Sequence, residues 1–176
     1  MQKTVERPPR TIMEVYKMLP EGTLAELING NIFMSPSPVR KHQRLILKLA
    51  SLMDQFVEKG DLGEVNVAPY DVYLDETENA VQPDIVFVAK ANISILGDTV
   101  HGVPDLLVEV LSPGNKSYDL ETKKQLYERF GVREYWVLDP ITRQAIGYAL
   151  LGSKFVEFSN EAGRVASRLL NHTFEF

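Results

Sequence analysis

The chain has 176 residues, 44% of them hydrophobic and 24% charged, and its net charge at pH 7 is −5. This length suits one domain with a sizeable core, which we expect to span residues 1–176 with residues 1–10 as a flexible arm. The absence of cysteine excludes disulfides, thiolate zinc sites and cysteine nucleophiles. No apolar run approaches the roughly 20 residues that span a membrane, and no signal peptide is visible, so we expect a cytoplasmic protein without a membrane partner.

The N-terminal part of the chain predicts a short helix and a β-hairpin. Thr11 with Glu14 three residues later is typical of a capping box and predicts a helix over 11–19. Asn29-Gly30 separates two apolar runs, and this dipeptide is the strongest short signal for a hairpin. Glu26 lies inside the first run, where it either points to solvent from an edge strand or serves a site.

A long amphipathic helix is predicted over residues 39–59. Apolar residues recur there at three- and four-residue spacing, and Gly60 is expected to end the helix. Its first half carries Arg40, Lys41, His42, Arg44 and Lys48. Cations oppose the dipole at a helix N-terminus, so this group indicates either contact with an anion such as phosphate or a plain solvated face.

The rest of the chain predicts a mixed α/β fold around a central sheet. Strands are expected over 63–67, 70–74, 83–88, 104–111, 134–138, 144–150, 154–158 and 165–170, with an acidic turn at 75–79. An irregular or briefly helical connection is expected over 90–102. A further helix should start at Ser117 or Asp119 and end at Gly131.

Two acidic residues at apolar strands define the candidate site. Asp84 directly precedes one apolar run, and Glu109 lies within the next one. A carboxylate in such a strand is costly unless it pairs with a cation or binds a metal ion. If the two strands are neighbours, both carboxylates project at one end of the sheet and, with the Val110 carbonyl, offer hard ligands for Mg²⁺ or Mn²⁺. Lys123 would stabilise developing charge or orient a water molecule.

Five short segments follow one another along most of the chain. They are Glu-Leu-Ile-Asn-Gly at 26–30, Pro-Asp-Ile-Val-Phe-Val at 83–88, Leu-Leu-Val-Glu-Val-Leu-Ser-Pro at 106–113, Tyr-Asp-Leu-Glu-Thr-Lys-Lys-Gln-Leu-Tyr at 118–127 and Gly-Val-Arg-Glu-Tyr-Trp-Val-Leu-Asp-Pro at 131–140. Together they resemble the Uma-type restriction endonuclease family of the PD-(D/E)XK nuclease superfamily. The resemblance implies a restriction endonuclease-like core, a central mixed sheet flanked by helices, with an N-terminal hairpin and a C-terminal antiparallel extension. It also implies a Mg²⁺-dependent homodimeric endonuclease that hydrolyses DNA.

The resemblance carries roles over to particular residues. The in-strand lysine of the nuclease motif is replaced here by Leu111, and Lys123 on the following helix takes its place. The implied catalytic residues are Asp84, Glu109 and Lys123, and the implied metal ligands are Glu26, Asp84, Glu109 and Val110. Supporting contacts around them are expected from His42, Gln82, Asp119 and Tyr127. Asp119 and Tyr127 each lie four residues from Lys123, and positions four apart share a helix face.

Simpler roles stay open for several of these residues. Asp84 is also typical of a strand-start cap after proline, and Asp119 of a helix cap. Tyr127 suits a core position, and Glu109 could form a buried ion pair with Lys123 without any metal. The chain could therefore be a non-catalytic nuclease-fold module for binding or assembly. It could also be a metal-dependent hydrolase of another phosphate ester, such as a nucleotide or RNA.

Overall fold

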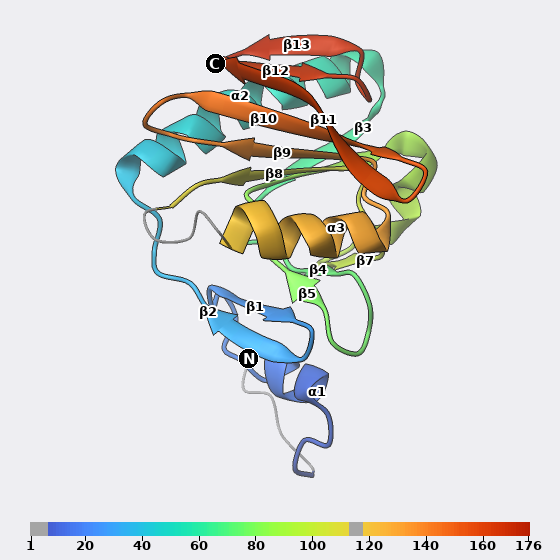
Figure 1. Ribbon diagram of the computed structural model, residues 1–176. Helices are drawn as coiled ribbons and strands as arrows, with labels where there is room; N and C mark the ends of the chain where they lie inside the picture. The colour runs from blue at the N-terminus through green and yellow to red at the C-terminus, as the bar shows by residue number, and fades with distance from the viewer. Residues whose placement is uncertain (1–6, 113–117) are drawn as a thin grey trace.

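A six-stranded sheet with helices on both faces forms the centre of the computed structural model (Figure 1). The structure describes residues 7–112 and 118–176, except for the side chains of 118–120. Strands β8 and β9 are parallel and the other neighbouring pairs are antiparallel, so the sheet is mixed, as predicted. In spatial order the strands are β11 (Lys154–Ala162), β10 (Gln144–Leu151), β9 (Glu134–Leu138), β8 (Leu106–Val110), β6 (Ile85–Ala89) and β3 (Gly63–Val67).

Side chains of the central strands alternate between the two faces. Ile85 and Phe87 pack into the core cluster that contains the long helix, whereas Val86 and Val88 pack into the cluster that contains the shorter one. The apolar residues of β8 alternate in the same way, and this alternation turns Glu109 toward the shorter helix. The helices are α2 (Arg40–Gly60) on one face and η2 (Tyr118–Lys123) with α3 (Lys124–Phe130) on the other.

A second sheet carries the predicted N-terminal hairpin and lies on the far side of α3 (Figure 1). Its order is β2 (Asn31–Met34), β1 (Ala25–Ile28), β5 (Ala80–Val81), β4 (Val72–Tyr73) and β7 (Val100–His101). Helix α1 (Ile12–Lys17) begins as predicted, with the Thr11 side chain accepting from the Glu14 N–H. The predictions did not include β5 and β7, because a two-residue strand has no measurable period.

The C-terminal antiparallel extension is present, but the strand predicted over 165–170 is shorter than predicted. Strand β12 (Arg164–Ser167) ends earlier, and after a turn β13 (His172–Glu175) pairs back with it. Leu170 lies in that turn, where its N–H donates to the Ser167 hydroxyl and its side chain is buried in the cluster around α2. Burial from a turn therefore produced an apolar pattern that resembles a strand.

The two long helical segments end in left-handed residues. Gly131, with φ 84°, ends α3 as predicted. Gly60 is the last residue of α2 and Asp61 takes the left-handed position at φ 50°, a conformation that aspartate tolerates. Much of the arm predicted over 1–10, and the predicted Ser117 cap, lie outside the described residues. Among the described residues, no helix is long and apolar enough to cross a membrane.

Asp75 fixes the predicted acidic turn. Desolvation raises the pKa of its carboxyl, but hydrogen bonds from the Glu78 and Thr77 N–H groups and the Asn79 amide outweigh it and lower the pKa to about 2. A lowered folded-state pKa stabilises the fold above the ordinary value of about 3.9, and the contribution is lost as pH falls toward 2. Because solvent screens this half-exposed group, we expect about 1 kcal/mol.

The measurement is urea unfolding of wild type and Asp75→Ala between pH 6 and pH 2. The pH-dependent part of the difference in unfolding free energy should vanish as the pH approaches the pKa of about 2. Glu78→Ala, an exposed acid in the same turn, is the matched control. A difference that stays constant across this range would contradict the assigned role of the carboxylate.

Gly147 in β10 leaves room for the buried Trp136 ring on β9. A Cβ at position 147 would lie 2.6–2.8 Å from three atoms of that ring, whose indole N–H also donates to Glu134. Overpacking of this kind costs about 1–3 kcal/mol, so Gly147→Ala should lower the free energy of unfolding by that amount. Gly97→Ala is the control, since its Cβ would make only an ordinary contact at 3.4 Å. Equal stability of the two variants, measured in urea, would refute the packing argument.

Candidate active site

Antiparallel pairing of β6 with β8 brings the two predicted acids together. Ile85 pairs with Val108, and extending this register by one residue places Asp84 opposite Glu109. The Val110 N–H donates to Asp84 Oδ2 at 2.7 Å, so the Asp84 carboxylate also caps the end of the pairing. The Asp84 side chain is 14% exposed and that of Glu109 is 4% exposed. The site therefore has one carboxylate that solvent reaches and one that is enclosed.

Glu109 is held from the α3 side by two donors. Lys123 Nζ lies 2.9 Å from Glu109 Oε1, and the Tyr127 hydroxyl donates to the same oxygen at 2.7 Å. Burial, reinforced by the Glu109 charge, raises the pKa of Tyr127 well above its usual range, so its hydroxyl stays a proton donor. The predicted buried pair of Glu109 and Lys123 is thus present. Tyr127 is a fully buried core residue, and its hydroxyl also hydrogen-bonds the Glu109 carboxylate.

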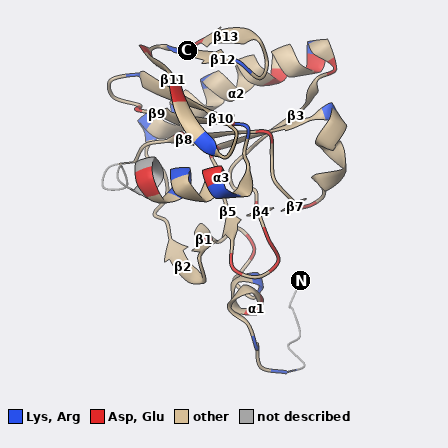
Figure 2. Cartoon of the chain, turned by 45° about the vertical axis from the view of Figure 1, so that its right-hand side comes forward, with Lys and Arg blue, Asp and Glu red and all other residues tan. Residues whose placement is uncertain are grey.

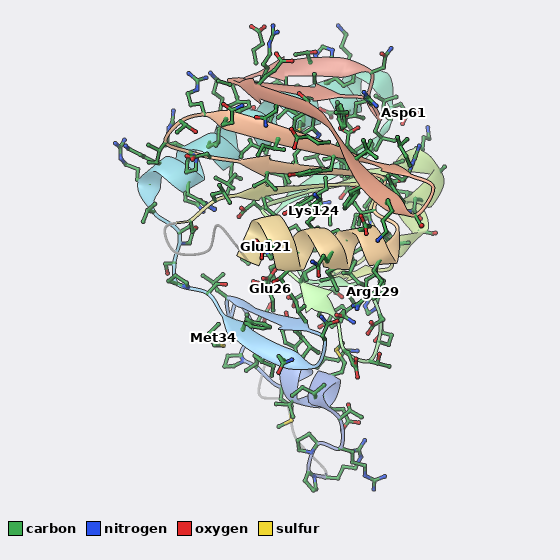
Figure 3. All side chains as sticks on the ribbon, viewed as in Figure 1. Glu26, Met34, Asp61, Glu121, Lys124 and Arg129 are labelled. Carbon is green, nitrogen blue, oxygen red and sulfur yellow. The ribbon has the colours of Figure 1, made fainter. Side chains whose placement is uncertain are left out.

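Glu26 reaches the same lysine from the second sheet. Its side chain is buried rather than solvent-facing, so the alternative of an outward-pointing Glu26 is wrong. Figure 3 places it between the hairpin and α3. Glu26 Oε1 lies 2.9 Å from Lys123 Nζ and accepts the Gln82 backbone N–H at 2.9 Å. One ammonium group therefore bridges carboxylates from two sheets.

His42 approaches from the opposite helix. It is buried on the first turn of α2, and its Nε2 lies 3.2 Å from Asp84 Oδ2. The site is thus held by α2 on one side and by η2 and α3 on the other. Neither helix could shift without changing the surroundings of a carboxylate.

These side chains line a cavity of about 230 Å³. Since a water molecule occupies about 30 Å³, the cavity has room for several. Of the residues predicted for the site, those that line it are Glu26, His42, Gln82, Asp84, Glu109, Val110 and Lys123. Tyr127 joins through Glu109, and the Asp119 side chain lies outside the described residues.

The sequence predictions missed Asp71 and Tyr16, whose hydrogen bonds support Gln82 at the cavity. The Gln82 side-chain amide donates to Asp71 Oδ1 at 2.8 Å, and the Tyr16 hydroxyl donates to the same oxygen at 2.9 Å. Burial first, and the Asp71 charge second, raise the pKa of Tyr16, which keeps its proton for this bond. This chain of contacts links α1 to the site through residues 55 positions apart, and no local pattern marks it.

The donor set fits a divalent cation. In their ionised forms the Glu26, Asp84 and Glu109 carboxylates and the Lys123 ammonium leave two negative charges in one cavity. Carboxylate and carbonyl oxygens suit Mg²⁺, which binds through one or two carboxylates and keeps several waters. Within residues 7–112 and 118–176, no group of three or more histidine, aspartate or glutamate side chains could hold a metal ion. Any metal here would therefore rest on two carboxylates, the Val110 carbonyl and water.

The comparisons with known proteins identify a fold and a family. A structural neighbour, described as a putative nuclease belonging to DUF820 from Anabaena variabilis ATCC 29413, superposes with a TM-score of 0.75. The match covers 93% of this chain and 92% of the neighbour at 18% sequence identity, so it shows a shared fold. No curated protein matches the chain in sequence. Residues 12–174 match the Uma2 family, which is described as "putative restriction endonuclease", and the chain therefore belongs to that nuclease-like family.

Proposed function

We propose that this chain is a Mg²⁺-dependent endonuclease that hydrolyses DNA phosphodiester bonds, with Mn²⁺ as a usable substitute. Membership of the Uma2 family supports nuclease chemistry in general. One observation carries the finer proposal: Lys123 bridges Glu26 and Glu109 at 2.9 Å inside a cavity that Asp84 also lines. The arrangement combines hard oxygen ligands and a cation, which are the groups that phosphoryl transfer requires.

Asp84, Glu109 and the Val110 carbonyl would hold the metal ion, and Glu26 would complete its surroundings. When bound, Mg²⁺ supplies positive charge to the phosphate oxygens and lowers the pKa of a bound water. Asp84 suits the entry side of the site, because it is the most exposed of the three acids. Its position lets a phosphate approach without opening the buried pair behind it.

Lys123 would contribute a positive charge beside the phosphate that is cleaved. Its ammonium is fixed between two carboxylates, so it needs little reorganisation when negative charge develops on a phosphate beside it. The Tyr127 hydroxyl on α3 donates to Glu109 and keeps its carboxylate oriented. His42 keeps Asp84 oriented from α2. The protein's own part in catalysis is therefore positioning and charge stabilisation rather than covalent chemistry.

The test uses the full chain and four substrates: duplex DNA, single-stranded DNA, RNA and a nucleoside triphosphate. We expect DNA cleavage with Mg²⁺ that stops with a chelator and in Glu109→Gln. Glu121→Gln, an exposed acid on η2, is the matched control and should keep its activity. Cleavage that persists in Glu109→Gln or in chelator would contradict the proposal. Hydrolysis of RNA or nucleotide alone would favour a different phosphate ester.

The same ion pairs favour a second candidate function. A lysine that neutralises two buried carboxylates can also be purely structural, and the chain would then be a non-catalytic nuclease-fold module. Calorimetry with Mg²⁺ and Mn²⁺ separates the two functions. No heat of binding for either ion would favour the module. The homodimer implied by the resemblance stays a prediction that sedimentation can measure.

A further inference from the structure

A second groove beside the candidate active site is lined by basic side chains. It has a volume of about 390 Å³, and its cations are Arg40, Lys41, Arg44, Lys48 and Arg143. The other lining residues are Leu45, Pro140 and Phe176, so the lining contains no aspartate or glutamate. This is unusual in a chain whose net charge is −5. The groove concentrates positive charge that the protein as a whole does not have.

These five cations have no ion-pair partner among the residues that the structure describes. In the described part of the chain, the salt bridges involve other lysines and arginines, and none joins a carboxylate to one of these five. Arg143 instead lies 5.7 Å from the centre of the Phe176 ring. The groove along α3 differs, because Lys124, Glu128 and Arg129 line it and mix both signs. Figure 2 shows blue and red segments together on α3.

The backbone around the groove favours an anion. Val39, the N-cap residue of α2, provides no side-chain cap, and the first turn of the helix contains no acidic residue. Helix N-termini carry positive partial charge, and the N–H groups of the first turn lack helical partners. Four of the five cations lie on the first half of this helix, where they add to that charge instead of balancing it. A bound anion would accept hydrogen bonds from the N–H groups of the first turn and would balance the charge of these cations.

Arg143 is positioned from a separate element. It ends the turn between β9 and β10 at φ 63°, and its N–H donates to the Asp139 carbonyl at 2.8 Å. The Asp139 carboxylate accepts the N–H groups of Ile141 and Thr142, which fixes the turn. The groove therefore has one wall from a helix and one from a turn that hydrogen bonds hold in place.

We infer that this basic groove binds the phosphate backbone of the DNA on which the candidate active site acts. The groove and the active-site cavity share the start of α2: Pro38, His42 and Gln43 line the cavity, while Arg40 and Arg44 line the groove. His42 and Arg44 are two positions apart, about 200° around the helix axis, so they lie on nearly opposite sides of α2, whose diameter with side chains is about 10 Å. That is about three nucleotide steps of 3.4 Å along B-DNA. The inference rests on the proposed function because it takes DNA as the substrate.

The test measures binding of a fluorescent DNA duplex by anisotropy between 50 and 200 mM salt, in EDTA and on the Glu109→Gln background. Each phosphate contact contributes about 0.9 to the slope of log affinity against log salt. If all five cations contact phosphates, affinity should fall about 500-fold over this range. In Arg44→Ala/Arg143→Ala it should fall only about 40-fold, since two contacts are lost.

The matched control is Arg10→Ala/Lys59→Ala, which removes the same charge from exposed positions outside the groove. Its slope should equal that of the parent protein. Equal slopes for the groove and control variants, or stronger binding to phosphatidylserine vesicles than to the duplex, would overturn the inference. Failure of the catalytic proposal looks different: the salt slopes would follow the prediction while the wild type cleaves no DNA with Mg²⁺.

Discussion

Lys123→Met is expected to lower the free energy of unfolding by about 3–5 kcal/mol, because it leaves buried carboxylates without their cation. Lys123 Nζ lies 2.9 Å from both Glu26 and Glu109, and all three side chains are at most 6% exposed. Methionine matches the length of lysine without its charge, so packing changes little. Urea unfolding at pH 7 in EDTA measures the loss.

Two further measurements separate charge from packing. Glu26→Gln/Glu109→Gln/Lys123→Met removes the whole charged group, and most of the stability should return, since replacing a complete buried ion cluster is often neutral. Mg²⁺ should raise the melting temperature of Lys123→Met more than that of the wild type, because a divalent cation that binds the folded state can replace the ammonium. A loss below about 1 kcal/mol in the single variant would contradict the bridging role.

Much of the site could be predicted because its residues break local patterns. Asp84 and Glu109 interrupt apolar strands, and the period of two in those strands fixes the face on which Glu109 lies. Lys123 and Tyr127 are four residues apart on a helix and reach the same Glu109 oxygen. Each of these inferences needs only residues that are close in the sequence. The roles of the residues come from the resemblance of five ordered segments to the nuclease family.

The remainder depended on contacts between distant parts of the chain. Glu26 lies 97 positions before Lys123, and its burial follows from packing of the second sheet against α3. From the hairpin alone, a solvent-facing Glu26 was equally consistent with the sequence. No local pattern marks Asp71 and Tyr16, because their roles depend on a hydrogen bond between α1 and a distant part of the chain beside the short strands.

The basic residues of α2 illustrate an alternative that the sequence left open. Their spacing is equally consistent with a solvated face and with an anion contact. The lining of the groove favours the anion contact, because it adds Arg143 from another element and no aspartate or glutamate. A cluster on one helix face becomes a candidate binding surface only when the fold brings a second wall to it.

Asp84→Asn is expected to reduce Mg²⁺-dependent DNA cleavage about 10²- to 10³-fold, because a bound metal contributes several kcal/mol and each 1.4 kcal/mol is about tenfold in rate. The fold should be kept. Asparagine still offers an oxygen to the Val110 N–H, which donates to Asp84 at 2.7 Å, so the free energy of unfolding should change by about 1 kcal/mol or less. Cleavage rates and Mn²⁺ affinity by calorimetry measure the two effects separately.

Asp105→Asn is the matched control, because Asp105, like Asp84, directly precedes a strand and accepts a backbone N–H, that of Ala89, at 2.8 Å. Asp105 Oδ1 binds Arg133 and lies outside the active-site cavity, so this variant should keep both Mn²⁺ affinity and cleavage. If Asp84→Asn keeps them as well, Asp84 is only a cap for the strand end, and the non-catalytic module gains support. If Asp84→Asn loses Mn²⁺ affinity while its stability is unchanged, the carboxylate serves the metal rather than the fold.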